Sequence, residues 1–109
     1  MTEIETTVTE RGVGVVTPKG RVTMTTAPRL REAVTDLVDA GTIRIVVDLG
    51  ETTFLDSSGL GSLVAGLKHC RQGGGDLRIA RPTAAVSTVL QMTNLDRILT
   101  PRDTVEEAY

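Results

Sequence analysis

The chain has 109 residues, a length typical of one domain, with 12 basic and 14 acidic side chains and a formal net charge of −2. Acids and bases are interspersed, and the only aromatic residues are Phe54 and Tyr109. A duplex-binding surface gathers Lys and Arg, and a single-strand surface needs aromatic platforms for the bases. The composition therefore argues against a nucleic-acid partner and predicts a core of aliphatic side chains.

The sequence also indicates the cellular compartment in which the protein is expected. Cys70 is the only cysteine, so neither an intramolecular disulfide nor a thiolate metal cluster is expected. The first ten residues lack the basic and apolar parts of a signal peptide. The longest charge-free apolar stretch, 57–67, is shorter than the ~20 residues of a membrane span. We therefore expect a cytoplasmic protein with no membrane span.

Two strands and a helix are predicted in the first part of the chain. β-branched residues alternate weakly over 4–9 and form a run over 13–17, and Pro18-Lys19-Gly20 is typical of a turn. From Ala27 the apolar residues recur at helical spacing, and Gly41 is a natural stop. Two threonines are candidates for the helix cap: Thr25 and Thr26.

The middle of the chain repeats this pattern. The run IRIVVDL, 43–49, is nearly continuous in β-branched residues, as in a central strand covered on both faces. A strand, a helix and a second buried strand predict a right-handed parallel crossover. A second helix is expected over 58–71, ended by the glycines at 73–75 and followed by a strand over 77–80.

The C-terminal part predicts shorter elements. We expect a third helix between Pro82 and Asn94, a short edge strand at 98–99, and a short helix capped by Asp103 or Thr104. No linker or low-complexity tract interrupts the chain. The fold class predicted is α/β, with one domain over 1–109, a mixed sheet of four to five strands and about four helices packed on it.

The segment DSSG, 56–59, raises the question of a serine nucleophile. A hydrolytic serine needs a base within hydrogen-bond reach, and the only histidine is His69. On one helix, Ser58 and His69 would lie ~16 Å apart along the axis. Lys68 fails for the same reason, and the G-x-S-x-G elbow is missing. We therefore do not expect an enzyme.

Phosphate and metal sites are not predicted either. Gly59 and Gly61 lack the third glycine of a dinucleotide-binding loop, and 73–75 follows a helix rather than preceding one. Asp48 and Asp56 have no companion ligands nearby in the sequence. No cofactor and no metal are expected.

Two interpretations of the serines remain open. Asp56 or Ser57 suits the helix cap, and Ser58 would then lie in the first turn, at the positive end of the helix dipole. The serines can serve capping and packing alone. Alternatively Ser58 is a phosphorylation site, where a phosphoryl group would add about −1.5 to −2 charges at the surface.

Three segments of the chain together resemble the STAS domain of bacterial anti-sigma factor antagonists. They are GRVTMTTAPRLREAV, the long segment IVVDLGETTFLDSSGLGSLVAGLKHCRQGGGDLRIA, and VLQMTNLDRIL. The most specific part is DSSGLG after an apolar strand, and VDL at 47–49 and TNLDRIL support it. The resemblance covers nearly the whole chain in the same order of elements.

This resemblance implies a function in transcription regulation through protein–protein interaction. Such antagonists bind an anti-sigma factor that is a serine kinase with ATP, and binding frees the sigma factor. The kinase phosphorylates the serine before the motif glycine, here Ser58, and a PP2C-type phosphatase resets the phosphoprotein. The residues expected to meet the partner are Asp56, Ser57, Ser58, Gly59, Leu60, Gly61 and Thr23.

Thr23 departs from the family pattern. Many members carry an acid in a G-x-[LI]-D segment after the second strand, where this chain has Gly20-Arg21-Val22-Thr23. Thr23 is either a tolerated turn residue or a sign of altered kinase recognition. It keeps open a non-switching STAS adaptor subunit of a transporter or sensory scaffold. A binder of a small ligand or nucleotide is a third possibility.

Overall fold

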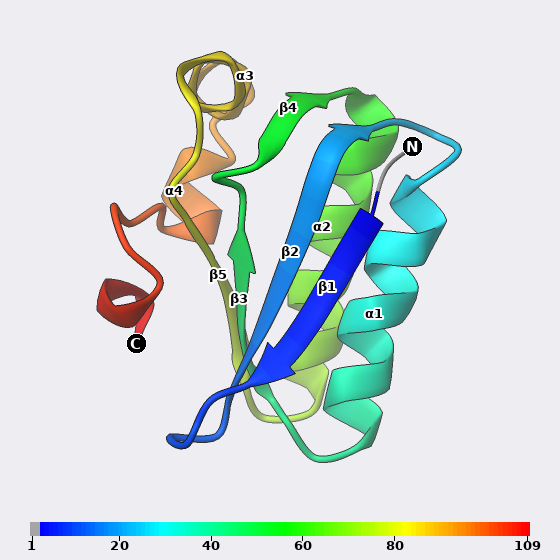
Figure 1. The fold of residues 1–109 in the computed structure, drawn as a ribbon, viewed down its shortest axis with the longest axis vertical. Coiled ribbons are helices and arrows are strands. Elements are labelled where there is room, and N and C mark those ends of the chain that lie inside the picture. The colour runs from blue at the N-terminus through cyan, green and yellow to red at the C-terminus, as the bar shows by residue number, and fades with distance from the viewer. Residues whose placement is uncertain (1–2) are drawn as a thin grey trace.

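The structure, a computed structural model, describes residues 3–109, and its centre is a mixed sheet (Figure 1). Within those residues the sheet has five strands, in the order β1-β2-β3-β5 with β4 on the far end of β2. β1 (Glu3–Val8) runs antiparallel to β2 (Val13–Val22). The other neighbours pair in parallel: β3 (Arg44–Asp48) with β2 and β5 (Asp76–Ala80), and β4 (Thr52–Leu55) with β2. The sheet is therefore mixed, as predicted.

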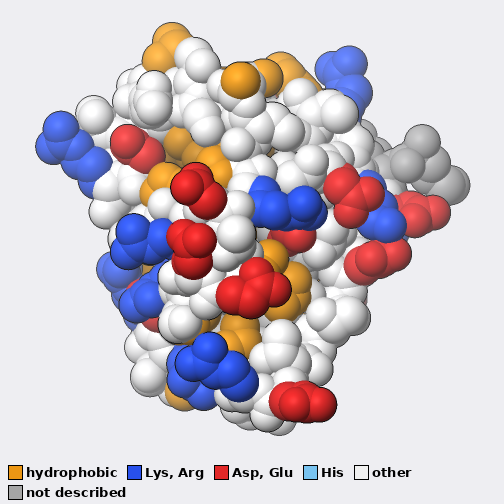
Figure 2. Space-filling model, turned by 60° about the vertical axis from the view of Figure 1, so that its left-hand side comes forward, with side chains coloured by type: hydrophobic (Ala, Val, Ile, Leu, Met, Phe, Trp, Pro, Cys, Tyr) orange, Lys and Arg blue, Asp and Glu red, His pale blue; other side chains and the backbone are white. Residues whose placement is uncertain are grey.

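Helices lie on both sides of this sheet. The two long helices, α1 (Ala27–Asp39) and α2 (Ser57–Gln72), run side by side on one face (Figure 1). The shorter α3 (Ala84–Met92) and α4 (Asp96–Leu99), with the 3-10 turn η1 (Glu106–Ala108), lie on the other side (Figure 1). On that second side, acidic and basic side chains alternate around small apolar patches (Figure 2).

The core is aliphatic, as the composition predicts. Its larger cluster fills the space between the sheet and α1 and α2, and α3 and α4 contribute to it through Val86, Leu90 and Leu99. A smaller cluster on the opposite face joins Val46 to the C-terminal segment. In β3 the side chains of Ile45 and Val47 enter the larger cluster and Val46 enters the smaller one. This alternation confirms the prediction of a central strand covered on both faces.

The predicted turn at 18–20 is wrong, because β2 continues through it to Val22. Gly20 has a φ of 86°, and the register of β2 against β4 shifts between Gly20 and Arg21. A glycine tolerates this left-handed conformation. The Pro-Lys-Gly signal thus marks a bulge where β2 exchanges β3 for β4 as its neighbour, not a reversal of the chain.

Other predictions near the chain's short elements also need correction. Strand β4 was not expected from the sequence. The predicted edge strand at 98–99 is instead part of α4, in which Leu99 enters the core and Ile98 stays exposed. The predicted short C-terminal helix is the single 3-10 turn η1, where the Thr104 hydroxyl accepts a hydrogen bond from the Glu107 N–H. Thr26 precedes α1, but its side chain does not cap a helix N–H.

The C-terminal segment is fastened to the sheet through Tyr109. Its hydroxyl lies 2.7 Å from the Asp76 carbonyl and 3.1 Å from that of Ile45, and the Arg78 guanidinium stacks over its ring. Burial, with the nearby Asp76 charge, raises the pKa of Tyr109 to about 12. The phenol therefore stays a hydrogen-bond donor throughout the physiological range.

A second link joins the C-terminal ends of β3 and β5. Asp48 is only 7% exposed, and its two carboxylate oxygens each accept a hydrogen bond from the Arg81 guanidinium at 2.9 Å. The Gly50 N–H donates to the same carboxylate at 3.0 Å. Asp48 belongs to the VDL segment that the sequence singles out, and its role here is structural. The bidentate pair fixes the end of β3 against β5.

We expect Arg81→Ala to lower the free energy of unfolding by about 1–2 kcal/mol, because it leaves a buried carboxylate with one backbone donor. The loss stays below that of a fully buried pair because the Arg81 side chain is 47% exposed. Urea unfolding followed by far-UV circular dichroism measures it. Arg97→Ala, at an exposed residue of α4, is the matched control and should shift stability by less than about 0.5 kcal/mol. Equal effects of the two substitutions would contradict the assignment.

Candidate functional site

The site begins where β4 passes into α2. Asp56 has an extended backbone, and its side chain accepts a hydrogen bond from the Gly59 N–H at 2.9 Å. Of the two candidate caps, Asp56 is therefore the one that caps α2. Ser57 is the first residue of the helix and is exposed, and Ser58 follows in the first turn, as predicted.

Gly59 allows the start of α2 to pack against the end of β2. A Cβ atom at this position would lie 2.8 Å from the Val22 carbonyl oxygen and 2.9 Å from a methyl group of Leu55. The Asp56 N–H also donates to the Val22 carbonyl, at 3.3 Å. Because Val22 precedes Thr23, this contact brings the Thr23 turn to the first turn of α2.

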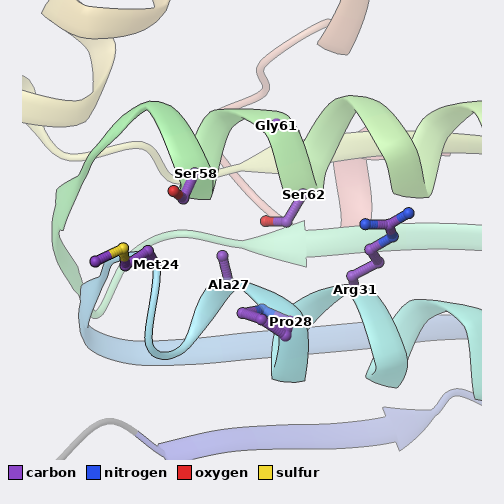
Figure 3. A pocket seen from close by; sticks show the side chains of 7 residues that line it. All are labelled: Met24, Ala27, Pro28, Arg31, Ser58, Gly61 and Ser62. Carbon is purple, nitrogen blue, oxygen red and sulfur yellow. The ribbon is translucent and has the colours of Figure 1, made fainter.

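A cleft of about 330 Å³ opens between the starts of the two long helices (Figure 3). Ser58 and Gly61 line it from α2, and Arg31 extends into it from α1 (Figure 3). Ser58 is half-buried and points into the gap between the helices (Figure 3). Its hydroxyl forms no hydrogen bond within residues 3–109. The remaining lining residues are Met24, Ala27, Pro28 and Ser62.

Gly61 differs from Gly59 although the two lie in one helical turn. Gly61 is exposed, and apart from its chain neighbours and the adjoining backbone of α2, no atom of residues 3–109 lies within 4 Å of the position that its Cβ would take. Its backbone also lacks the left-handed φ that favours glycine. A glycine inside a helix lowers stability by about 1 kcal/mol relative to alanine. Neither packing nor backbone geometry in this structure requires glycine at position 61.

The structure brings most of the predicted partner-binding residues to one end of the molecule. Asp56, Ser57, Ser58 and Gly61 reach its surface, and Thr23 is half-buried beside them. The other two, Gly59 and Leu60, are buried. Their role in this chain is to hold the helix start from inside, and contact of any of the seven with a partner stays a prediction.

His69 lies toward the other end of α2 and is not beside the serines. Its Nε2 lies 3.1 Å from Asp39 Oδ1, so it links the C-terminal parts of α1 and α2. The separation of Ser58 and His69 argued from the sequence is therefore seen in the fold, and the two do not form a dyad.

The sequence does not indicate that α1 and the turn before it line the cleft. Met24, Ala27, Pro28 and Arg31 precede Ser58 by a whole crossover, and no local pattern ties them to it. Ser62 is different, since a spacing of four residues places it on the same helical face as Ser58. Its buried hydroxyl donates to the Gly59 carbonyl at 2.7 Å.

Comparison with known families is decisive for the fold. A family model described as the STAS domain matches residues 4–108. The chain belongs to the STAS domain family. This assignment confirms the resemblance and the fold class predicted from the sequence.

Two relatives carry names that bear on function. A Thermotoga maritima protein described as a candidate anti-sigma factor antagonist is 36% identical over 73 residues, which are 67% of this STAS chain and 65% of that protein. The match thus spans slightly less than two thirds of that relative's length. The anti-sigma-B factor antagonist of Staphylococcus aureus is 30% identical over 80 residues, covering 73% of this chain and 74% of that one.

Solved structures agree with this assignment. The crystal structure of the Thermotoga maritima protein matches with a TM-score of 0.88 at 29% identity, covering 96% of this chain and 90% of that one. An anti-sigma factor antagonist from Mycobacterium paratuberculosis matches with a TM-score of 0.87 at 27% identity, covering 99% and 91%. In the part of this chain that the structure describes, no helix combines the length and the apolar character that crossing a membrane requires.

The two glycines of the site predict opposite effects of the same substitution. We expect Gly59→Ala to lower the free energy of unfolding by about 1–3 kcal/mol, because the added methyl group overlaps the Val22 carbonyl. Gly61→Ala should raise it by about 0.5–1 kcal/mol, because its methyl group enters open space in a helix. Urea unfolding of the two variants beside the parent chain measures both. Changes of the same sign would refute this distinction.

Proposed function

We propose that this STAS domain, over residues 1–109, is a cytoplasmic anti-sigma factor antagonist, and that phosphorylation of Ser58 ends its binding to an anti-sigma factor serine kinase. The observation that carries the proposal is the Ser58 hydroxyl, which opens into a surface cleft on the first turn of α2 without a hydrogen bond inside residues 3–109. Relatives named as antagonists support the first half of the proposal.

In this proposal the chain is a substrate and carries no catalytic group. The Ser58 oxygen forms a bond to the γ-phosphorus of ATP, the bond from that phosphorus to the leaving oxygen breaks, and ADP departs. The hydroxyl proton passes to a base of the kinase, which also supplies the nucleotide and magnesium. Since no bond within the described chain holds the hydroxyl, phosphorylation requires no rearrangement of the helix start.

The fold tolerates the modified residue while the partner surface changes. A phosphoserine adds about −1.5 to −2 charges, and the first turn of α2 is the helix end that stabilises negative charge. Inverting a binding equilibrium from 1:99 to 99:1 takes about 5.5 kcal/mol of differential affinity. A dianion covered by a partner without a counter-charge supplies several kcal/mol of this. In the same proposal a PP2C-type phosphatase reaches the phosphoserine through the open cleft, and water takes the phosphoryl group, which restores the Ser58 hydroxyl and releases inorganic phosphate.

Thr23 favours one alternative function. It stands where many family members carry an acid, and its N–H donates to the Thr26 hydroxyl at 3.0 Å, in the turn that leads to α1. A chain without that acid is compatible with a non-switching adaptor subunit of a transporter or sensory scaffold. An adaptor of this kind would bind its partner without being phosphorylated.

Phosphorylation of Ser58 is tested with the anti-sigma factor that co-purifies with the chain. We expect incubation with ATP to label the chain at Ser58, as mapped by mass spectrometry of its peptides. Ser58→Ala should abolish the label and keep binding, whereas Ser58→Asp should weaken binding by about tenfold or more because it introduces charge at the contact. Isothermal titration calorimetry measures both affinities.

Ser57→Ala is the matched control, because Ser57 is the neighbouring exposed hydroxyl on the same helix turn. It should keep the label on Ser58. Label on Ser57, or equal affinities of the Ser58→Ala and Ser58→Asp variants, would contradict the switch. Binding without any label would favour the adaptor.

A further inference from the structure

The cleft at Ser58 is the upper end of a longer groove between α1 and α2. A second hollow, of about 320 Å³, continues it along the same pair of helices, and Arg31 lines both. We define the α1–α2 groove by three residues from each helix: Pro28, Arg31 and Thr35 from α1, and Gly61, Ala65 and Lys68 from α2. Each set follows the three- and four-residue spacing of a single helix face.

The charged side chains of this groove are basic. Arg31 and Lys68 are both exposed, and neither forms an ion pair with another residue of the described chain. No carboxylate of residues 3–109 lines either hollow. The second hollow also includes His69, whose bond to Asp39 marks the lower end of the groove.

The acids of α1 lie elsewhere on that helix. Glu32 and Asp36 line a separate depression beside Ile4 of β1. The chain has a net charge of −2, yet this groove carries two cations that form no ion pair within residues 3–109. An electropositive groove of this kind attracts anionic groups from a partner.

The floor of the groove is low where it meets Ser58. Gly61 contributes no side chain to the cleft at Ser58, and Ala65 contributes only a methyl group to the second hollow. The exposed Gly61 has no packing reason to be glycine, as its open surroundings show. A position without a side chain lets the main chain of another molecule approach the helix closely.

We propose that the α1–α2 groove binds an acidic segment of the anti-sigma partner, with carboxylates at Arg31 and Lys68 and its main chain passing over Gly61. This inference rests on the proposed function and assigns the chemistry of the partner. It also explains how one phosphate can release the partner. Because Ser58 and Arg31 line the same cleft, a phosphate on Ser58 adds an anion to the groove that holds the partner's carboxylates and repels them.

The first test needs no knowledge of the partner. Synthetic octaglutamate is titrated into the ¹⁵N-labelled full chain at low salt, and octalysine serves as the control peptide. We expect octaglutamate to shift the amide resonances of Gly61 and Ala65, and octalysine not to shift them. Shifts spread over the whole surface, or none at the groove, would overturn the proposal.

The second test uses the anti-sigma factor that the chain binds. We expect the double variant Arg31→Glu/Lys68→Glu to weaken binding by about tenfold or more, with most of the loss disappearing at high salt. The matched control is Arg11→Glu/Arg97→Glu, which makes the same change in net charge at exposed residues outside the groove. The control should change the affinity by less than about threefold, as expected of a long-range charge effect alone. Equal weakening by the two double variants would overturn the proposal.

Folding of each variant is verified from its amide spectrum, and Arg31→Gln/Lys68→Gln repeats the test without introducing new acids. The two tests separate the proposals. If the parent chain binds and is labelled but the groove variants bind as tightly as the control, the acidic segment is wrong and the switch stands. If no anti-sigma factor binds the parent chain, the proposed function fails, and a localised octaglutamate response still supports an acid-binding groove.

Discussion

The architecture of the site depends on one close backbone contact, between the first turn of α2 and the Val22 carbonyl at the end of β2. Gly59 permits this contact because it has no Cβ, and the Asp56 N–H adds a hydrogen bond to the same carbonyl. The contact fixes where α2 begins relative to the turn that leads into α1. As a result two long helices start next to each other, and the residue beside Gly59, Ser58, faces the cleft between them. A helix start held from inside can change its surface chemistry without moving.

Elements whose signal is local were predictable from the sequence. The run at 43–49 has enough β-branched residues to specify a buried strand, and the helical spacings from Ala27 and from Ser58 specify α1 and α2. Elements that depend on contacts with residues far away in the sequence were not predictable. Pro18-Lys19-Gly20 has the composition of a turn, yet pairing with β1 and β4 keeps it in a strand. The short segment 98–99 has strand-like residues, but it is the end of α4, where the Leu99 N–H donates to the Leu95 carbonyl and the Leu99 side chain lies in the core.

The same division applies to the site. A cap at Asp56 or Ser57 and the position of Ser58 in the first turn follow from DSSG alone, because capping involves only neighbouring residues, and the structure selects Asp56. The contribution of Arg31 follows only from the packing of α1 against α2. The segment GLG shows the limit most clearly, since its two glycines are equivalent in the sequence. In the fold Gly59 is required by a contact 2.8 Å away, whereas Gly61 faces open space.

This contrast separates what stabilises the domain from what a partner can recognise. Gly59, Leu60 and Ser62 are buried, and the Ser62 hydroxyl donates to the Gly59 carbonyl, so these residues stabilise the fold. Within residues 3–109, the cleft holds two groups without an internal partner, the Ser58 hydroxyl and the Arg31 guanidinium, together with the exposed helix backbone at Gly61. A phosphate added there alters the charge of the cleft but removes no internal hydrogen bond. The domain can therefore keep its structure in both states, and the difference between them is sensed by whatever molecule contacts the cleft.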